Sequence, residues 1–437
     1  MKFFTREICV CAHLTQTRDA QRACAEMGII MKKNIIVGQS GGPTAAINAS
    51  LAGVYQAARD AGFGVYGMRY GIEGLLQGKY VDLSEHIKND LDKELLLRTP
   101  SSYLGSCRYK LPEAEAGSEI YEQIFALLEK LNIFAFFYIG GNDSMDTIKK
   151  LSDYAALCGS KILFVGVPKT IDNDLACTDH TPGFGSAAKY IAATTKEVIR
   201  DGLVYDIPSV TILEIMGRNA GWLTAAASLA KGADCEGVDM LFLPEIPFDL
   251  DSFSGQVKAL MQNRKSLVIA VSEGIRLKDG RFVCELASDS NAVDAFGHKM
   301  MQGAGKYLAD FLHASLGIKT RAIELNTPQR CAAHFSSRTD ITESYSAGTA
   351  AVKAALEGKS GIVITLERTS TVPYLCTTSC QDVHKIANVE KKVPVEWIDT
   401  ENFSVTEEAL AYLRPLIQGE MSPIMINGLP GHLYLQA

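Results

Sequence analysis

Two acidic strings directly follow neighbouring apolar runs of this chain. The run FAFFYI leads into GGNDS, which contains Asp143, and the run ILFVGV leads into PKTIDND, which contains Asp172 and Asp174. Carboxylates beside a glycine loop suit Mg²⁺ that is held by few protein oxygens together with a substrate phosphate. One carboxylate can also serve as a base toward a hydroxyl. The alternative is that these aspartates cap helices or turns, a role that suits Asp174 well.

A glycine-rich string, GQSGGPTAAINA, follows the apolar run 35–37. Glycines allow a close backbone approach and positive φ, and the N-terminus of a following helix offers free N–H groups to an anion. The string is therefore a candidate phosphate loop, although it is neither a Walker loop nor GxGxxG. Tight strand–helix geometry explains the glycines equally well.

Arginines also follow apolar runs. Arg218 lies in MGRNAGW after the run 209–215, Arg330 ends NTPQR, and Arg108 lies in LGSCRY. Guanidinium groups bind phosphate through paired hydrogen bonds, so these arginines predict a phosphorylated ligand. Any one of them is explained equally well by a surface salt bridge.

Two further charged residues belong to the same set of candidates. Arg321 stands at the start of the run 320–325, and Glu273 lies in the string SEG after the run 266–271. Glu273 would accept hydrogen bonds from sugar hydroxyls, or else cap a helix.

The elements that position these residues alternate regularly. Continuous apolar strands that alternate with helices predict parallel sheets covered on both faces, a doubly wound α/β fold, and two lobes. Ligands of such sheets lie beyond the carboxyl ends of the strands. The expected strands are 35–37, 64–69, 134–139, 162–167, 209–215, 238–243, 266–271, 320–325 and 361–366, and the expected helices are 45–58, 117–131, 144–157, 186–200, 219–230 and 299–315.

Composition narrows the class of protein. The chain has 437 residues, is 47% hydrophobic and carries a formal charge of −7. This apolar content excludes disorder, the acidity argues against nucleic-acid binding, and no apolar run is long enough to span a membrane. The eleven cysteines lack zinc or disulfide spacing, so free thiols in a reducing cytoplasm are expected.

Together these strings resemble the phosphofructokinase family from about residue 33 to about residue 365. The resemblance rests on the ordered set SGGPTAAINA, LGSCRY, IGGNDS, PKTIDND, MGRNAGW, SEG and TPQR. It implies two Rossmann-like lobes with the active site in the cleft between them. It also implies a cytoplasmic enzyme that phosphorylates the 1-hydroxyl of fructose 6-phosphate with Mg²⁺.

The resemblance also implies a division of the chain. Residues 31–182 would form the donor-binding lobe, 183–330 the sugar-phosphate lobe, and 331–437 a segment that completes both. At Met31 the sequence begins to read like the start of an α/β protein, so either Met31 is the natural start or residues 1–30 form an N-terminal extension of no catalytic consequence.

Residue roles follow by matching motifs. Asp172 would be the general base, supported by Thr170 and Asp174. The sugar phosphate would be held by Met216, Gly217, Arg218, Glu273, Arg321 and Arg330, and the donor by Gly42, Arg108, Gly141 and Asn142.

Two positions indicate which phosphoryl donor the chain uses. Members that use ATP resemble GGDGS and PGTIDND, with glycine where this chain has Asp143 and Lys169. A charged side chain that overlaps the α-phosphate of a nucleotide would cost several kcal/mol through strain and desolvation. The pair therefore resembles the pyrophosphate-dependent branch, in which the lysine steadies the departing phosphate.

Three positions depart from the family pattern. Asn142 stands where an aspartate usually binds Mg²⁺, so Asp143 would share or take over the metal. Thr327 replaces a histidine or tyrosine that often contacts the sugar phosphate. Ser209 replaces a subunit-bridging arginine, which leaves the usual allosteric tetramer in question.

The alternatives are an ATP-dependent 6-phosphofructokinase and a non-catalytic regulatory subunit of the same fold. Sedoheptulose 7-phosphate is a further possible acceptor. The expected partners are fructose 6-phosphate, pyrophosphate and further copies of the chain in a dimer or tetramer, with no nucleic acid and no membrane.

Overall fold

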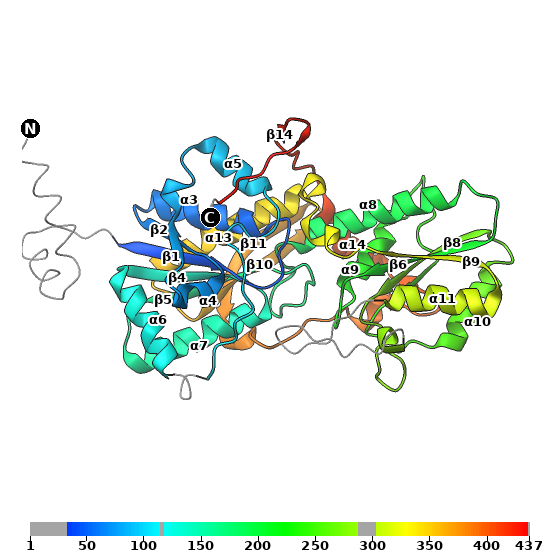
Figure 1. The fold of residues 1–437 in the computed structure, drawn as a ribbon, viewed down its shortest axis with the longest axis horizontal. Coiled ribbons are helices and arrows are strands. Elements are labelled where there is room, and N and C mark those ends of the chain that lie inside the picture. Colours follow the sequence, from blue (N-terminus) through cyan, green and yellow to red (C-terminus); the bar gives the residue numbers. More distant parts are fainter. Residues whose placement is uncertain (1–32, 114–117, 287–302, 436–437) are drawn as a thin grey trace, which may run out of the picture.

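The computed structural model of this chain describes residues 33–113, 118–286 and 303–435. Two lobes, each built around one β-sheet, lie side by side along the long axis of the molecule (Figure 1). The predicted extension 1–30 and the first residues of the predicted helix 299–315 lie outside the described residues.

The first lobe contains a seven-stranded sheet in the order β11-β10-β5-β4-β1-β2-β3. The five inner strands are parallel, and the edge strands β3 and β11 are antiparallel to their neighbours. The bounds are β1 Asn34–Gln39, β2 Gly64–Met68, β3 Tyr80–Asp82, β4 Ile133–Gly140, β5 Leu163–Pro168, β10 Ile362–Thr371 and β11 Tyr374–Asp382.

Helices cover both faces of this sheet, which is why its inner strands are apolar throughout. Along β1, Ile35 and Val37 pack toward one face and Ile36 packs toward the other. The first face is covered by α3 Ile47–Asp60, α5 Asp90–Arg98 and α13 Arg338–Leu356. The second face is covered by α4 Gly71–Leu76, α6 Ser118–Lys130 and α7 Asn142–Cys158.

The α3 and α13 helices approach each other unusually closely through two glycines. A Cβ atom at Gly53 would lie 2.1 Å from the Tyr345 carbonyl oxygen, and one at Gly348 would lie 2.0 Å from the Ser50 carbonyl oxygen. Neither position accepts a side chain without separation of the helices. The contact joins the C-terminal segment to the first lobe.

The second lobe contains a parallel four-stranded sheet in the order β7-β8-β6-β9. One face packs against α8, α9 and the following 3₁₀ helix η2, and the other packs against α10 and α11 (Figure 1). The bounds are β6 Ser209–Ile215, β7 Met240–Phe242, β8 Ser266–Ser272, β9 Lys319–Glu324, α8 Phe184–Gly202, α9 Trp222–Ala225, η2 Ala226–Ala230, α10 Leu250–Leu260 and α11 Ala304–Leu316.

The predicted helix 219–230 is wrong at its start. Gly217 has a φ of +144°, and residues 217–221 form a loop, so the helix begins only at Trp222 and becomes a 3₁₀ helix at Ala226. The observed helix α7 begins at Asn142, two residues before the predicted start at residue 144. Asn142 and Asp143 therefore lie in the first turn of α7.

Residues beyond 331 contribute to both lobes. Their α13, β10 and β11 belong to the first lobe, while Val405, Leu410 and Leu413 join the core of the second. The remaining elements are α12 Pro328–Cys331, β12 Ile398–Asp399, β13 Ser404–Val405, α14 Glu407–Leu413, β14 Met425–Ile426, β15 Leu429–Pro430, and the 3₁₀ helices Leu83–Glu85, Val283–Leu286, Ala333–Phe335, Val383–Lys385, Val395–Trp397 and Arg414–Ile417.

The doubly wound α/β fold predicted from the apolar runs is confirmed, and the boundaries proposed at 182/183 and 330/331 stay a prediction. Among the described helices, none has both the length and the apolar character needed to cross a bilayer.

Candidate active site

The two acidic strings lie at the same end of the first sheet. Strands β4 and β5 are parallel neighbours, and their last residues, Gly140 and Pro168, are paired. The chain continues past each strand end into Asp143 and Asp172, respectively. The predicted gathering of these carboxylates at one sheet edge is therefore confirmed.

Lys169 joins the β5 loop to the glycine-rich loop that follows β1. Its side chain is buried, and its ammonium donates a 2.7 Å hydrogen bond to the carbonyl oxygen of Gly42. Burial lowers the pKa of the ammonium to about 8, although the nearby Asp172 carboxylate opposes this shift. Gly41, with a φ of +77°, gives the glycine loop the turn that brings it beside this ammonium.

The LGSCRY loop packs on the same glycine loop. Ser106 donates its hydroxyl to the Gly41 carbonyl oxygen at 2.7 Å, and the Gly41 N–H donates to the Cys107 carbonyl oxygen at 3.5 Å. Arg108, the next residue, is exposed. Its backbone is thus anchored beside the glycine loop, as a donor-binding role requires.

Asn142 and Asp143 begin α7 beside Gly141. The Asn142 amide nitrogen donates to the Val389 carbonyl oxygen at 3.4 Å, while its buried Oδ1 has no hydrogen-bond partner within the described residues. Asp143 is exposed, and its charge acts on Lys169. An unpartnered amide oxygen beside an exposed carboxylate is a donor set that fits a hard cation such as Mg²⁺.

Asp172 lies at the meeting point of the two lobes. Its backbone N–H donates to the Thr170 hydroxyl oxygen at 3.0 Å, and that hydroxyl lies 3.3 Å from the Asp172 carboxylate. Burial raises the pKa of Asp172, against the opposing effects of Thr170 and of the cations Lys169, Arg218 and Arg330. The arrangement holds a carboxylate of increased basicity among positive charges.

Asp174 is partly buried two residues further on. Burial raises its pKa to about 7, and the neighbouring Asp172 charge adds to the shift. The next helix, α8, begins only at Phe184, so neither Asp172 nor Asp174 caps it. Neither aspartate therefore caps this helix, and the alternative that they cap a turn stays a prediction.

The second lobe contributes polar groups from the ends of β6 and β8. The Gly217 N–H donates to the Glu273 carboxylate at 3.3 Å, and the Met216 N–H donates to the Gln329 side-chain oxygen at 3.2 Å. Burial raises the pKa of Glu273 to about 8, with further contributions from the charge of Asp172. The charge of Asp172 therefore acts on Glu273 from the other lobe.

Two arginines complete the group. Arg218 and Arg330 are partly buried, and the buried Nε atom of each has no hydrogen-bond partner among the described residues. A Cβ atom at Gly42 would lie 3.6 Å from a terminal nitrogen of Arg330, so this guanidinium reaches the glycine loop. Buried donors without partners suit a phosphate ligand.

Arg321 does not join this group within the chain. It lies at the amino end of β9, away from the carboxyl ends that carry the other residues, and its side chain is 56% exposed. Its guanidinium lies 3.8 Å from the Asp201 carboxylate. Its predicted contact with the sugar phosphate stays a prediction.

A sequence model of the phosphofructokinase family matches residues 34–355. This chain belongs to the phosphofructokinase family. A pyrophosphate–fructose 6-phosphate 1-phosphotransferase of Methylococcus capsulatus is 40% identical to it over 408 residues, which are 92% of this chain and 96% of that relative.

Solved structures agree with this assignment. The crystal structure of a pyrophosphate-dependent phosphofructokinase from Nitrosospira multiformis has a TM-score of 0.82 and 36% identity, covering 92% of this chain and 96% of that chain. An ATP-dependent 6-phosphofructokinase of Corynebacterium efficiens is 32% identical over 365 residues, 82% of this chain and 95% of that relative. The family is therefore established, and relatives that use each donor resemble this chain.

The phosphofructokinase site also includes two residues to which the sequence analysis assigned no role. Lys391 donates to backbone oxygens directly behind the Asp172 loop, and Gln329 fixes the backbone at Met216. Lys391 belongs to a segment that crosses from one lobe to the other, a position that depends on tertiary structure. In the sequence, only the TPQR string drew attention to Gln329.

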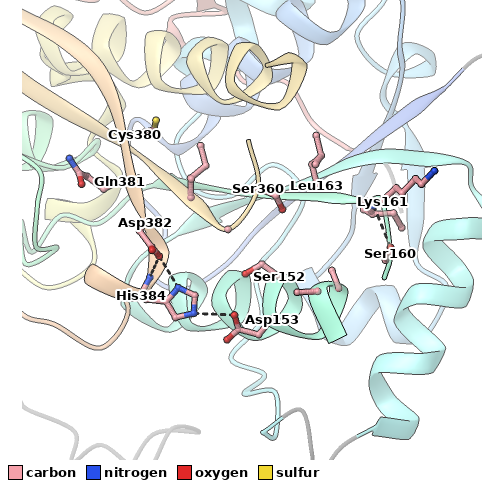
Figure 2. Close-up of a pocket in the computed structure, with 15 residues that line it drawn as sticks. Ser152, Asp153, Ser160, Lys161, Leu163, Ser360, Cys380, Gln381, Asp382 and His384 are labelled. Atoms are coloured by element: carbon pink, nitrogen blue, oxygen red, sulfur yellow. Dashed lines mark hydrogen bonds and ion pairs between the residues drawn. The ribbon is translucent and has the colours of Figure 1, made fainter. Parts of the chain in front are cut away.

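Two cavities of this phosphofructokinase lie outside the catalytic group. One of about 510 Å³ lies between α7 and the β10–β11 pair, where His384 bridges Asp153 and Asp382 (Figure 2). The other, of about 840 Å³, lies between α13 and β11. Neither is lined by any residue predicted for the active site.

Proposed function

We propose that this phosphofructokinase transfers a phosphoryl group from pyrophosphate to the 1-hydroxyl of fructose 6-phosphate, as a diphosphate–fructose-6-phosphate 1-phosphotransferase. The observation that carries the proposal is the buried Lys169 ammonium, bonded to Gly42 in the space that the family resemblance gives to the α-phosphate of a nucleotide. The reaction is close to equilibrium and serves both glycolysis and gluconeogenesis.

Lys169 selects the donor in two ways. Its side chain fills the space beside the glycine loop, and its charge would neutralise the phosphate that departs from pyrophosphate. Asp143 adds negative charge at the mouth of this region, which opposes a longer polyphosphate. A nucleotide would have to displace both groups.

Asp172 accepts the proton in the transfer step. As the bond between the sugar 1-oxygen and phosphorus forms, the bond from phosphorus to the bridging oxygen of pyrophosphate breaks, and orthophosphate leaves. The proton of the 1-hydroxyl passes to the Asp172 carboxylate. Thr170 orients this carboxylate, and Arg108 offsets charge on the group in transit.

The sugar phosphate binds on the side of the second lobe. Arg218 and Arg330 supply guanidinium donors for the 6-phosphate, and Glu273 pairs with a sugar hydroxyl beside the backbone of Met216 and Gly217. Burial raises the pKa of Glu273 to about 8, and in its protonated form this carboxyl can donate that hydrogen bond.

The chain would bind Mg²⁺ through Asn142 and Asp143, and the ion would supply positive charge beside the donor phosphates. We further propose a homo-oligomer that works in the cytoplasm. Sedoheptulose 7-phosphate is a second acceptor to be tested with the same assay.

The test is turnover of the purified chain with fructose 6-phosphate and either pyrophosphate or ATP as the sole donor. We expect kcat/KM with pyrophosphate to exceed that with ATP by about 100-fold or more, in line with a misfit worth several kcal/mol. Equal or better use of ATP would make the chain an ATP-dependent enzyme. No turnover with either donor would favour a regulatory subunit.

A further inference from the structure

The segment that contains Lys391 crosses from the first lobe to the second directly behind the catalytic loops. Before the crossing, the Asn388 side chain donates to Asp146 in α7 at 3.0 Å. At the crossing, the Trp222 indole N–H of α9 donates to the Lys391 carbonyl oxygen at 3.1 Å. The backbone of Lys391 is therefore fixed to the second lobe while its segment stays attached to the first.

Both the backbone and the side chain of Lys391 bind the chain around Asp172. The Lys391 backbone N–H donates to the Asp174 carbonyl oxygen at 2.7 Å. Its ammonium donates to the carbonyl oxygens of Asp179 at 2.6 Å and Thr178 at 3.2 Å. It also lies 3.4 Å from Oδ1 of Asn173, the residue next to the base.

Asn173 needs such support because it has a φ of +54°, a conformation that costs energy in a residue with a side chain. Its fully buried side chain accepts from the Thr181 N–H at 3.1 Å and donates to the Tyr412 hydroxyl at 2.9 Å. Tyr412 in turn donates to Asp179, the same carbonyl that Lys391 binds. One network thus holds the residue beside Asp172 in its strained conformation.

The acceptors of the ammonium are neutral oxygens, and Trp222 lies over it with its ring centre 5.2 Å away. Burial lowers the pKa of Lys391 to about 8, so the fold bears a cost to keep a cation here. A neutral amide offers two N–H donors, whereas an ammonium offers three and can satisfy all three acceptors at once.

We propose that Lys391 is a positioning residue for phosphoryl transfer, which holds the 173–179 backbone so that Asp172 points at the acceptor hydroxyl. The inference rests on the proposed role of Asp172 as base. Lys391 touches no position assigned to donor or sugar, so its loss should lower kcat and leave substrate binding largely unchanged.

The experiment compares Lys391→Met with Lys392→Met, a matched change at the adjacent exposed lysine. Kinetics are measured with whichever donor the wild type uses, so the choice of donor does not affect the result. We expect Lys391→Met to lower kcat by on the order of 10²-fold, as for a misplaced catalytic group, with KM values within about threefold. Lys392→Met should match the wild type, and Lys391→Arg should recover part of the loss.

Hydrogen exchange supplies a readout that does not depend on activity. Amides of 173–181 should exchange on the order of tenfold faster in Lys391→Met than in Lys392→Met. Unchanged kcat, a loss confined to KM, or unchanged exchange in this segment would each overturn the inference. If Lys391→Met does not fold, Lys391→Arg and Lys391→Gln take the same measurements, and kcat must fall in the order Lys, Arg, Gln.

A wild type that is inactive with both donors would refute the proposed function. Hydrogen exchange would still test whether Lys391 holds this segment. A wild type that is active with either donor, beside an equally active Lys391→Met, would refute only the role of Lys391.

Discussion

At the residue scale, the chemistry proposed for this chain depends on the carboxylate of Asp172. Burial disfavours the ionised form of this carboxylate, and nearby cations partly offset that effect. Burial raises the pKa of Asp172, while Lys169, Arg218 and Arg330 stabilise its ionised form. The result is a base that is stronger than an ordinary aspartate.

Replacement of this base tests its role directly. We expect Asp172→Asn to lower kcat by about 10³-fold or more, because the amide cannot accept the proton of the 1-hydroxyl. Binding of fructose 6-phosphate, measured by calorimetry, should stay mostly intact. Asp153→Asn, at a partly buried aspartate that pairs with His384 in the distant cavity, is the control and should keep the activity of the wild type. Full activity of Asp172→Asn would remove the mechanism.

The metal ligands can be separated in the same way. We expect Asp143→Asn to raise the Mg²⁺ concentration needed for half-maximal activity by about tenfold, because a carboxylate binds the ion more strongly than an amide. Asn142→Ala should cause a smaller increase, since it removes a neutral oxygen. The opposite order would assign the metal chiefly to Asn142, and no change in either variant would place it elsewhere.

At the element scale, the close contact of α3 and α13 makes the first lobe depend on the C-terminal segment. We expect Gly348→Ala to lower the free energy of unfolding by on the order of 2–4 kcal/mol, because its Cβ atom would overlap the Ser50 carbonyl oxygen at 2.0 Å. Urea unfolding provides the measurement.

The matched control is Gly255→Ala in α10, where a Cβ atom would meet nothing within 4 Å. This change should stabilise the protein by about 0.5–1 kcal/mol, since alanine loses less entropy than glycine in a helix. Equal effects of the two substitutions would contradict the close-packing interpretation.

The elements that the sequence predicted well are those whose environment is uniform. Strands β4 and β5 are buried on both faces, so each appears as a continuous apolar run, and their predicted bounds agree with the structure within about one residue. The α13 helix was not predicted, because its stretch RTDITESYSAGTAAVKAAL is stabilised by small-residue packing on α3, which depends on tertiary structure. The antiparallel strand β11 was also not predicted, because it contains partly buried and exposed residues and no continuous buried run.

In the candidate site, too, some residues could be predicted from the sequence, whereas others depend on tertiary structure. The loops at the carboxyl ends of β4, β5, β6 and β8 were located correctly because parallel strands bring their carboxyl ends to one edge. The same rule argues against Arg321, because an arginine near the start of a strand lies toward the amino ends of the strands, away from the site. Lys391 was missed because its contacts depend on how a late segment crosses between the lobes.

At the scale of the whole molecule, the meeting of two lobes buries acidic groups that titrate far above their usual range. Burial raises the pKa of Asp174 to about 7 and that of Glu273 to about 8. The folded protein then binds more protons than the unfolded chain between about pH 4.5 and pH 8. These groups therefore reduce stability as the pH rises through this window.

One variant isolates this effect. We expect Glu273→Gln to raise the free energy of unfolding by on the order of 1 kcal/mol at pH 8 and to leave it nearly unchanged at pH 4.5, because the amide keeps the acceptor for Gly217 without the charge. Thermal unfolding across this pH range provides the measurement. An equal increase in the free energy of unfolding at both pH values would show that ionisation of Glu273 does not cause the effect.

The choice of donor also belongs to the whole molecule, because Lys169 from one loop, Gly42 from another and Arg330 from the second lobe meet at one point. The most direct test of this choice is kcat/KM with pyrophosphate and with ATP for the wild type and for Lys169→Gly, with Lys161→Gly as an exposed control. We predict that Lys169→Gly lowers kcat/KM with pyrophosphate by about 100-fold, as for the loss of a charge-stabilising group. The preference of the enzyme for pyrophosphate over ATP should become smaller in this variant. Unchanged use of pyrophosphate in Lys169→Gly would contradict the account.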